Sequence, residues 1–391
     1  MKLAYYYHVA INKSENTYTI PGYLGVFIDT MATMVDELYV LHHAANEFEA
    51  CQCDYKIKGE NIIFISLGTK TPAWHRGIFY NRVLKKPLER IEHCDALIVR
   101  SPSPLAPYFS KYFRKSKGLF LLVVGDYIVG AEHLKSSTFR DRMIYQYLRF
   151  NDHFFTKEIK RSNLIVNSIE LHEKYHLIAK SIDIIKTTTL TKSDFYHRED
   201  TCNRDVIELL YTGRIDVAKG LIEFLDATNI LLKEGYKLNL NIVGWEQDEI
   251  NKPLENRMKA IAKDYGIENN LIFHGRKSIG SELNEFYRQA DLYLMPSYHE
   301  GFPRTIWEAM ANSLPVIATR VGGIPAYLTH AENAYLIESK DINEIVNSIK
   351  SLISNNDLRR MIISNAFLKA METTLDSQTE LMLTIVKKNL N

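Results

Sequence analysis

Short apolar runs alternate with longer amphipathic stretches along the first half of this chain. Each run is too short for a buried helix and predicts a strand covered on both faces, as in a parallel sheet. Such strands are expected at residues 3–9, 38–42, 62–66, 96–100, 119–124 and 164–167, with helices at 24–35, 78–91 and 139–147 among them. This alternation favours an α/β fold built on a doubly wound parallel sheet.

The second half repeats this rhythm after a polar break. Residues 187–205 show no hydrophobic periodicity, and we interpret them as a linker. Strands follow at 206–211, 238–243, 271–273, 292–295, 315–319 and 334–337, with helices at 219–233, 254–263, 282–289, 342–353, 357–371 and 374–387. The pattern therefore predicts two domains, at residues 1–186 and 187–373, and a chain of 391 residues is long enough for both.

The densest group of candidate functional residues begins where the strand at 292–295 ends. The following loop holds Glu300, and Pro303 stands where a helix can begin, since its fixed φ suits a first helical turn. That helix carries Glu308. Two carboxylates on a loop and a helix can approach one ligand from different sides, and a carboxylate accepts hydrogen bonds from sugar hydroxyls. The alternative is that both are ordinary exposed charges.

A second buried strand, at 315–319, leads into Gly322 and Gly323. Paired glycines suit a backbone that approaches a phosphate closely, with the N–H groups of the next helix aimed at it. Both strand ends fall at one edge of a parallel sheet, where open α/β sheets bind ligands. The stretch is thus predicted to bind a sugar and a phosphate together.

The same stretch also matches a known pattern. The letters PSYHEGFPRTIWEAMA, followed by PVIAT and by GG, closely resemble the retaining GT-B glycosyltransferases of the GT4 type. Their E-x7-E signature is matched by Glu300 and Glu308. The resemblance implies two Rossmann-like domains that face a central cleft, an acceptor-binding domain followed by a donor-binding one. It also implies that the last helix, at 374–391, crosses back onto the first domain.

Two cations are expected at the same sheet edge. Arg214 follows the first strand of the second domain, and Lys219 opens the next helix. A nucleotide-sugar donor leaves a diphosphate, so fixed Arg and Lys groups would stabilise the charge on the departing oxygen without a metal ion. Their spacing resembles the Gly-Arg and Lys-Gly pair of GT4 enzymes, although each residue alone is more often a surface charge.

The resemblance extends to further donor-binding positions. Glu308 would accept the ribose hydroxyls, and the backbone of Arg276 and Lys277 would contact the nucleotide base. Gly22, in a glycine-bearing turn after the first strand, would face the donor, with a plain turn as the alternative. The full expected donor set is Glu308, Gly301, Phe302, Pro303, Thr305, Gly322, Gly323, Gly22, Gly244, Arg276 and Lys277.

One feature of the family pattern is missing. Many GT4 enzymes have a histidine at the end of a first-domain strand, near the donor sugar. Here Asp126 follows the strand expected at 119–124 and is a candidate to replace that histidine, as a fourth catalytic group beside Glu300, Arg214 and Lys219. The alternative is a carboxylate that caps the next turn.

Composition limits the hypothesis further. Hydrophobic residues make up 46% of the chain and charged residues 24%, as in soluble globular proteins, and no apolar run is long enough to span a bilayer. The four cysteines lack zinc-ligand spacing, so no metal site is expected. So few cysteines, with no recognisable signal peptide, indicate a reducing cytoplasm.

Charge is distributed unevenly along the chain. Residues 1–190 contain 25 Lys and Arg against 19 Asp and Glu, whereas the remainder contains 23 against 28. Basic and aromatic residues mix at 111–117 and again at 140–161, a combination that suits an anionic membrane surface. The alternative is two amphipathic helices whose aromatic residues face the core.

Together these features predict a retaining, metal-independent glycosyltransferase, similar to hexosyltransferases. The donor is expected to be a nucleotide-sugar, a UDP-sugar in preference to a GDP-sugar, and the acceptor a hydroxyl of a glycan or lipid-linked glycan. We expect no further cofactor, no nucleic-acid partner, and a cytoplasmic enzyme of bacterial surface polysaccharide or glycolipid assembly, with peripheral attachment to the inner membrane face as a hypothesis.

Three alternatives compete with this prediction. A sugar phosphorylase of the same fold needs a pyridoxal phosphate lysine in a longer chain, and a nucleotide-sugar epimerase lacks the E-x7-E signature, so both are disfavoured. A catalytically inactive GT-B partner or regulatory subunit of another glycosyltransferase stays open, because the first-domain histidine is missing.

Overall fold

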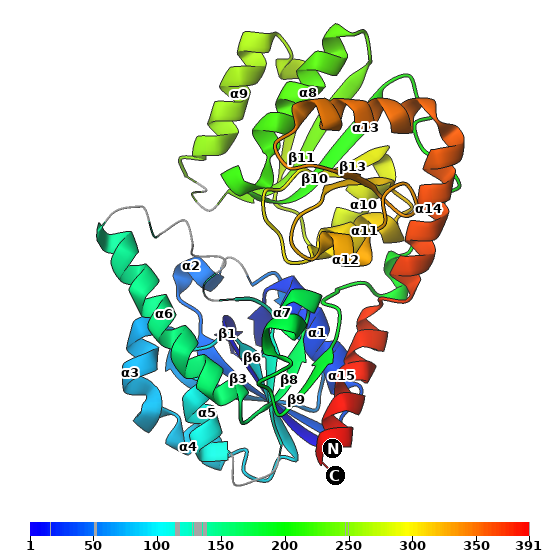
Figure 1. Ribbon diagram of the computed structural model, residues 1–391. Helices are drawn as coiled ribbons and strands as arrows, with labels where there is room; N and C mark the ends of the chain where they lie inside the picture. Colours follow the sequence, from blue (N-terminus) through cyan, green and yellow to red (C-terminus); the bar gives the residue numbers. More distant parts are fainter. Residues whose placement is uncertain are drawn as a thin grey trace. The chain divides into compact units, whose positions relative to one another are not determined.

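The computed structural model describes the chain except for residues 16, 51–52, 114–117, 127, 129–134, 136–138, 247, 249 and 391, and except for the side chains of residues 48, 74, 78 and 81. Its contacts define two compact units (Figure 1). Unit 1 comprises Met1–Thr187 and Leu375–Asn391, and unit 2 comprises Thr188–Thr374. The division thus falls one residue after the expected boundary between domains.

Unit 1 is built on a mostly parallel sheet. Its main strands run in the order β5–β3–β1–β6–β7–β8–β9, and every neighbouring pair is parallel. The short strands β2 and β4 extend the sheet from β1 in antiparallel orientation. The strand bounds are β1 Lys2–Ser14, β2 Thr17–Ile20, β3 Glu37–Ala44, β4 Tyr55–Lys56, β5 Ile62–Thr69, β6 Ala96–Ser101, β7 Leu119–Val123, β8 Asn163–Val166 and β9 Ser181–Ile184.

Helices cover both faces of this sheet (Figure 1). On one face, α1 and the C-terminal helix α15 share a core with β1, in which Leu3, Ile28 and Val386 are fully buried. On the other face, Phe109 of α5 and Ile159 of α6 are fully buried. The helix bounds are α1 Gly22–Ala32, α2 Glu47–Ala50, α3 Ala73–Val83, α4 Lys85–Glu89, α5 Ala106–Phe113, α6 Phe139–Ile159, α7 Ile169–Tyr175 and α15 Leu375–Leu390.

Unit 2 has a fully parallel sheet in the order β12–β11–β10–β13–β14–β15. Every residue of β13 and β14 is buried, because helices cover both faces of the sheet. Their continuous apolar sequences suit this burial on both faces. The strand bounds are β10 Ile207–Ile215, β11 Leu238–Glu246, β12 Leu271–Gly275, β13 Leu292–Met295, β14 Val316–Thr319 and β15 Tyr335–Ile337. The helix bounds are α8 Leu221–Lys233, α9 Pro253–Tyr265, α10 Ser281–Gln289, α11 Arg304–Ala311, α12 Ile324–Tyr327, α13 Ile342–Ser354 and α14 Asn356–Met371.

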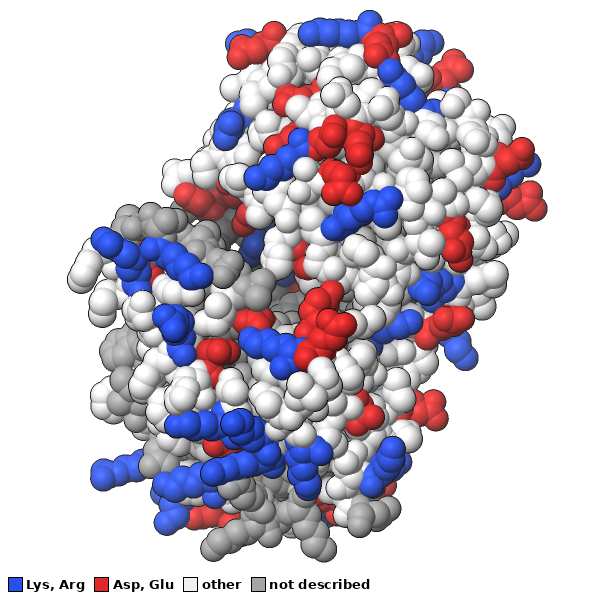
Figure 2. Space-filling model, in the orientation of Figure 1, with Lys and Arg blue, Asp and Glu red and all other residues white. Residues whose placement is uncertain are grey.

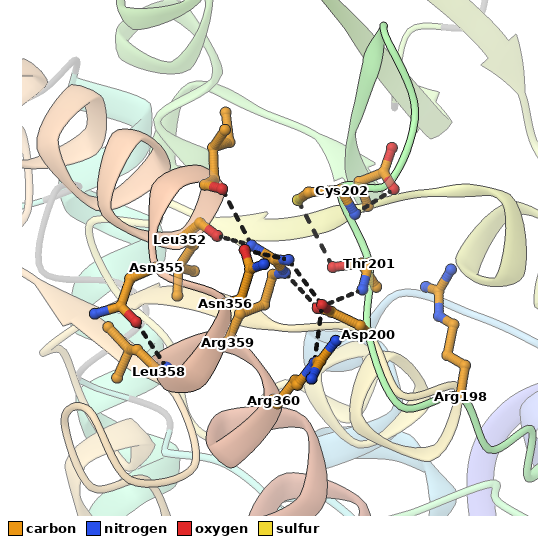
Figure 3. Close-up of polar contacts among 12 residues, drawn as sticks. Arg198, Asp200, Thr201, Cys202, Leu352, Asn355, Asn356, Leu358, Arg359 and Arg360 are labelled. Carbon is orange, nitrogen blue, oxygen red and sulfur yellow. Dashed lines mark hydrogen bonds and ion pairs between the residues drawn. The ribbon is translucent and has the colours of Figure 1, made fainter.

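The polar segment expected to be a linker is fixed to unit 2. Arg359 of α14 is 1% exposed and donates from Nε and Nη2 to the two carboxylate oxygens of Asp200, at 2.5 and 2.9 Å (Figure 3). Arg360 donates to the same carboxylate at 3.1 Å, and Arg198 donates to the carbonyl of Ala290 at 2.8 Å. The linker interpretation is therefore wrong for most of this segment. Hydrogen bonds and ion pairs, and not a periodic apolar face, attach it to the rest of unit 2.

Candidate functional site

The carboxyl ends of neighbouring strands bring the unit 2 candidates to one edge of the sheet. Arg214 is the penultimate residue of β10, and Lys219 ends the 3₁₀ turn that follows it. β13 lies next to β10 and is followed by the loop of Glu300. β14 lies next to β13 and is followed by Gly322. This is the edge at which open α/β sheets bind ligands.

Glu300 and Lys219 form an ion pair. Lys219 Nζ lies 2.5 Å from Glu300 Oε1, and the Ser297 hydroxyl donates to the same oxygen at 2.8 Å. The two charged side chains are 17% and 11% exposed, for Lys219 and Glu300 respectively. A charge-assisted hydrogen bond in such a shielded position fixes the orientation of both groups. The structure therefore pairs Glu300, the residue expected to bind the sugar, with Lys219, a residue expected to bind the diphosphate.

Arg214 is more exposed than this pair. Its guanidinium Nη2 lies 3.3 Å from Asp216, and its side chain is 51% exposed. The backbone at this point is held from inside, because the buried Tyr211 hydroxyl donates to the Arg214 carbonyl at 2.8 Å. An exposed ion pair contributes little to stability. Arg214 thus places a second cation at this edge of the sheet, with a side chain that is half exposed and not fixed by packing.

Gly322 allows two backbone segments to meet. Its φ is +51°, and a Cβ at this position would lie 1.6 Å from the Glu300 carbonyl oxygen. The N–H of Gly323 donates to the Gly301 carbonyl at 2.8 Å. A close approach requires Gly322 to lack a Cβ, but the approaching group is the Glu300 carbonyl of the neighbouring loop. The approach of Gly322 and Gly323 to a phosphate stays a prediction.

Glu308 lies in a buried polar network. It is 4% exposed, and its carboxylate accepts from the Tyr287 hydroxyl at 2.8 Å and from the Thr189 hydroxyl at 3.1 Å. Arg304 Nε lies 3.6 Å from the same carboxylate, and the Tyr287 oxygen lies 2.6 Å from the Thr212 hydroxyl. Burial, and then the Glu308 charge, raise the pKa of Tyr287 far above its ordinary value, so its hydroxyl stays a proton donor.

Sequence reasoning missed three residues of this site: Ser297, Tyr287 and Thr189. Tyr287 falls on the core-facing side of an expected helix, where an aromatic residue predicts packing and not a hydrogen bond to a carboxylate. Thr189 lies in the segment that we expected to be a linker. The roles of Tyr287 and Thr189 depend on contacts with Glu308, 21 and 119 residues away, which no local pattern records. Ser297 bonds Glu300 only three residues away, so the short spacing could have indicated it.

The loop between Gly301 and α11 is held by aromatic packing. The Phe302 ring centroid lies 4.7 Å from that of Trp307 and 4.9 Å from that of Tyr327. Pro303 immediately precedes α11, as its sequence position predicts, and Thr305 lies on the first turn. The helix that carries Glu308 therefore begins directly beside the Glu300 loop.

The candidates at the ends of β11 and β12 are also packed against their neighbours. A Cβ at Gly244 would lie 1.7 Å from the Gly213 carbonyl oxygen, so β10 and β11 approach closely there. The Arg276 guanidinium lies 5.2 Å from the Trp245 ring centroid, and Lys277 Nζ lies 3.3 Å from Glu282. These contacts anchor the segment expected to contact the base.

Gly22 and Asp126 belong to unit 1, and both have partners there. The Gly22 N–H, at the start of α1, donates to Asp54 Oδ1 at 2.7 Å. Asp126 Oδ1 accepts from the Ile128 N–H at 2.7 Å, and its Oδ2 lies 2.5 Å from Lys174 Nζ. For Asp126 this is the geometry of the turn-capping alternative, with an ion pair added.

The aromatic residues expected at a membrane surface fall into two groups. Phe113 and Phe155 are 1% and 2% exposed and belong to the core, whereas Phe150 and Phe154 of α6 are 61% and 41% exposed. Lys and Arg side chains gather on the face of unit 1 seen in Figure 2. Residues 114–117, which contain three of the expected cations, lie outside the described residues.

Two features are absent from the part of the chain that the structure describes. Among the described residues, no three or more His, Cys, Asp or Glu side chains are grouped so as to hold a metal ion. None of their helices combines the length and the apolar character that crossing a bilayer requires.

Comparison with known proteins gives matches over both units. Residues 192–369 match the family model for glycosyl transferases group 1. Protein CapJ of Staphylococcus aureus is 23% identical over 370 residues, 93% of this chain and 90% of CapJ. The capsular polysaccharide biosynthesis glycosyltransferase CapM of the same species is 29% identical over 168 residues, 43% of this chain and 42% of CapM.

The crystal structure of HepE from Anabaena, in complex with UDP and glucose, has a TM-score of 0.70. It is 17% identical to this chain and covers 99% of it, with 100% of HepE matched. The chain therefore has the GT-B fold of two Rossmann-like domains, and the matches support the group 1 glycosyltransferase family.

Proposed function

We propose that this chain is a retaining glycosyltransferase that moves a sugar from a nucleoside diphosphate sugar to an acceptor hydroxyl. The observation that carries the proposal is the Lys219–Glu300 ion pair at the carboxyl ends of β10 and β13. The group 1 match covers nearly all of unit 2 and supports the same assignment.

In this proposal Glu300 orients the donor sugar by accepting hydrogen bonds from its hydroxyls. Lys219, itself oriented by Glu300, and Arg214 stabilise the negative charge that develops on the departing diphosphate. Glu308 already accepts from Tyr287 and Thr189, but a carboxylate has about four lone-pair sites and can also accept from ribose hydroxyls.

Retention and metal independence are part of the proposal. The resemblance implies front-face attack, in which the leaving phosphate takes the proton of the acceptor hydroxyl. Glycosidases use a pair of carboxylates that flank the glycosidic bond, and such a pair is not needed for front-face attack. Because Lys219 and Arg214 supply positive charge at the leaving group, activity is expected to survive EDTA.

The donor and the pathway are proposed from the similar proteins. HepE binds UDP and glucose, which supports a UDP-sugar as donor. The name of CapM supports a role in the assembly of a surface polysaccharide, with a glycan or lipid-linked glycan as acceptor. Peripheral attachment to an anionic membrane through α6 of unit 1 fits such an acceptor.

The experiment first ranks UDP-, GDP- and ADP-sugars by the increase in unfolding temperature that each causes, and then follows their hydrolysis or transfer. Glu300→Gln keeps the shape of the side chain but removes its charge, so turnover is expected to fall about 100-fold or more. Glu268→Gln, an exposed change in the same unit, is the matched control.

Wild-type turnover by Glu300→Gln would show that the site is assigned wrongly. Binding of a donor without hydrolysis or transfer to any acceptor tested would favour the inactive-partner alternative. Loss of activity in EDTA that Mg²⁺ or Mn²⁺ restores would contradict metal independence.

A further inference from the structure

A second group of polar residues lies toward the carboxyl ends of the unit 1 strands. Between its pairing positions Tyr6 and Ala10, β1 has three residues where β3 has one. The middle one of the three is His8. A bulge of this kind changes the direction of a side chain and is often found beside functional sites. On β3, the residue after this bulge is His43, which pairs with Ala10 of β1.

Arg76 of α3 is the unusual member of this group. It is 5% exposed, and within the described part of the chain its Nε and Nη1 have no hydrogen-bond partner. One turn later on α3, the Tyr80 ring lies 5.7 Å from the His43 ring, so this side of α3 packs against β3. Burying these two guanidinium nitrogens without acceptors is costly, because the water they lose is not replaced.

His43 also has an unused polar atom. It is fully buried, with Nε2 at 3.3 Å from the Tyr6 hydroxyl, and among the described residues its Nδ1 has no partner. Burial first, and then neighbouring cations that include Arg76 and Lys70, lower the pKa of His43 to about 3. Burial first, and then Arg76, Lys70 and Arg100, lower the pKa of His8 to about 4, so both imidazoles are neutral at pH 7.

The charges that face these imidazoles are positive. The charged groups that act on His43 are Arg76 and Lys70, and those that act on His8 are Arg76, Lys70 and Arg100. Burial lowers the pKa of both His42 and His8, so these neighbours of His43 add no charge. The carboxylate of Glu49 pairs with Lys70 at 2.6 Å, where both side chains are partly exposed. Among the described residues no carboxylate pairs with Arg76, so an anion would supply acceptors to Arg76 and His43 together.

We propose that Arg76, His43 and His8 form a binding site for a phosphate-type oxyanion carried by the acceptor substrate. The guanidinium offers forked N–H groups and each imidazole one more donor, so a group with several oxygens satisfies them at once. The proposal deepens the proposed function, on which it rests, by stating that the acceptor is anionic. The hydroxyl that receives the sugar would then belong to a phosphorylated glycan or lipid-linked glycan.

The experiment measures phosphate binding while the donor site is filled. The full chain is saturated with UDP, and the increase in unfolding temperature is followed during titration with inorganic phosphate, with sodium chloride at equal ionic strength as reference. Wild type is expected to be stabilised by phosphate beyond chloride. Arg76→Met is expected to weaken phosphate binding at least about tenfold, since it removes charge-assisted hydrogen bonds.

A second readout separates a binding role from a structural one. Because two nitrogens of the buried Arg76 have no acceptor among the described residues, Arg76→Met is expected to raise the unfolding temperature of the phosphate-free protein. A residue that merely held the fold together would lower it. Arg82→Met removes an exposed cation from the same helix and should leave both measurements unchanged.

The source of the anion is tested with glucose 1-phosphate. Competition between this ester and inorganic phosphate would support a phosphate group carried by the acceptor. If the ester does not bind, the claim that the acceptor carries the anion is overturned and the site binds free phosphate. No effect of phosphate beyond chloride on UDP-saturated wild type, or an unchanged response in Arg76→Met, would overturn the anion site. If UDP itself does not bind, it is the proposed function that fails.

Discussion

Tyr287 connects the fold of unit 2 to its candidate site through one oxygen atom. Its hydroxyl donates to Glu308 at 2.8 Å and lies 2.6 Å from the Thr212 hydroxyl on β10. All three residues are buried, so each hydrogen bond in this network replaces water that the groups have lost. The network therefore both stabilises α10 against the sheet and orients the carboxylate.

Tyr287→Phe is expected to destabilise the protein by about 1–3 kcal/mol, because Glu308 keeps its burial but loses a donor. We also expect weaker UDP binding, since Glu308 is then less firmly oriented. Urea denaturation and UDP-induced thermal stabilisation measure the two effects. Tyr265→Phe is the control, because that hydroxyl bonds Asp226 at the surface. A variant with wild-type stability and UDP response would contradict the role given to the network.

At the scale of elements, the loop of Glu300 depends on its contact with the turn before α12. Gly322→Ala combines a left-handed φ of +51° with a Cβ placed 1.6 Å from a backbone carbonyl. Gly266→Ala has a similar φ of +71° but meets no atom within 4 Å. The second variant is expected to lose about 1–2 kcal/mol from backbone strain, and the first clearly more, with loss of donor binding. Equal losses in urea denaturation would show that the contact does not matter.

The segment before β10 is held by the Asp200–Arg359 pair (Figure 3). Asp200→Asn at pH 7 leaves Arg359 buried with a weaker partner and should cost about 3–5 kcal/mol. Asp205→Asn, an exposed change in the same segment, should cost almost nothing. Urea denaturation of both variants tests this, and equal stabilities would contradict it.

The same pair should give stability a dependence on pH. Burial raises the pKa of Asp200, but hydrogen bonds from Arg359 and the Thr201 N–H outweigh this and hold it below its ordinary value. The folded pKa is thus lower than the unfolded pKa of about 4, so the stabilisation is complete above it and lost as pH falls through the folded pKa. The difference between wild type and Asp200→Asn should therefore shrink below about pH 4, and a constant difference would contradict this.

Strands with a continuous apolar run could be predicted from sequence even when they are short, whereas short strands of partly exposed residues could not. β13 is the element whose expected range, 292–295, matches its observed bounds. In contrast, β2, β4 and β9 were missed, since four residues or fewer, most of them partly exposed, carry no clear period. α6 extends far beyond the expected 139–147, because its exposed Phe150 and Phe154 break the amphipathic pattern of a helix with one buried face.

At the scale of the whole molecule, exposed aromatics and cations on α6 predict binding to anionic vesicles. Replacing Arg140, Arg142 and Arg149 by Ser should abolish co-sedimentation with phosphatidylglycerol vesicles at low salt, since each cation contributes about 1 kcal/mol near such a surface. Removing the same charge from unit 2, at Lys233, Arg257 and Lys263, should leave binding unchanged. Absence of wild-type binding at low salt, or equal effects of the two triple variants, would contradict the hypothesis.

The sequence by itself determined the α/β class, the two units and the edge of unit 2 at which Glu300, Lys219 and Arg214 meet. These follow from local periodicity and from the rule that parallel strands end at a common edge. Only the tertiary structure decided that Lys219 pairs with Glu300 and that Tyr287 and Thr189 bond Glu308. It also decided that two nitrogens of the buried Arg76 have no acceptor among the described residues. Partners far apart in sequence and the loss of water around a charge arise only when the chain is packed, so no local pattern encodes them.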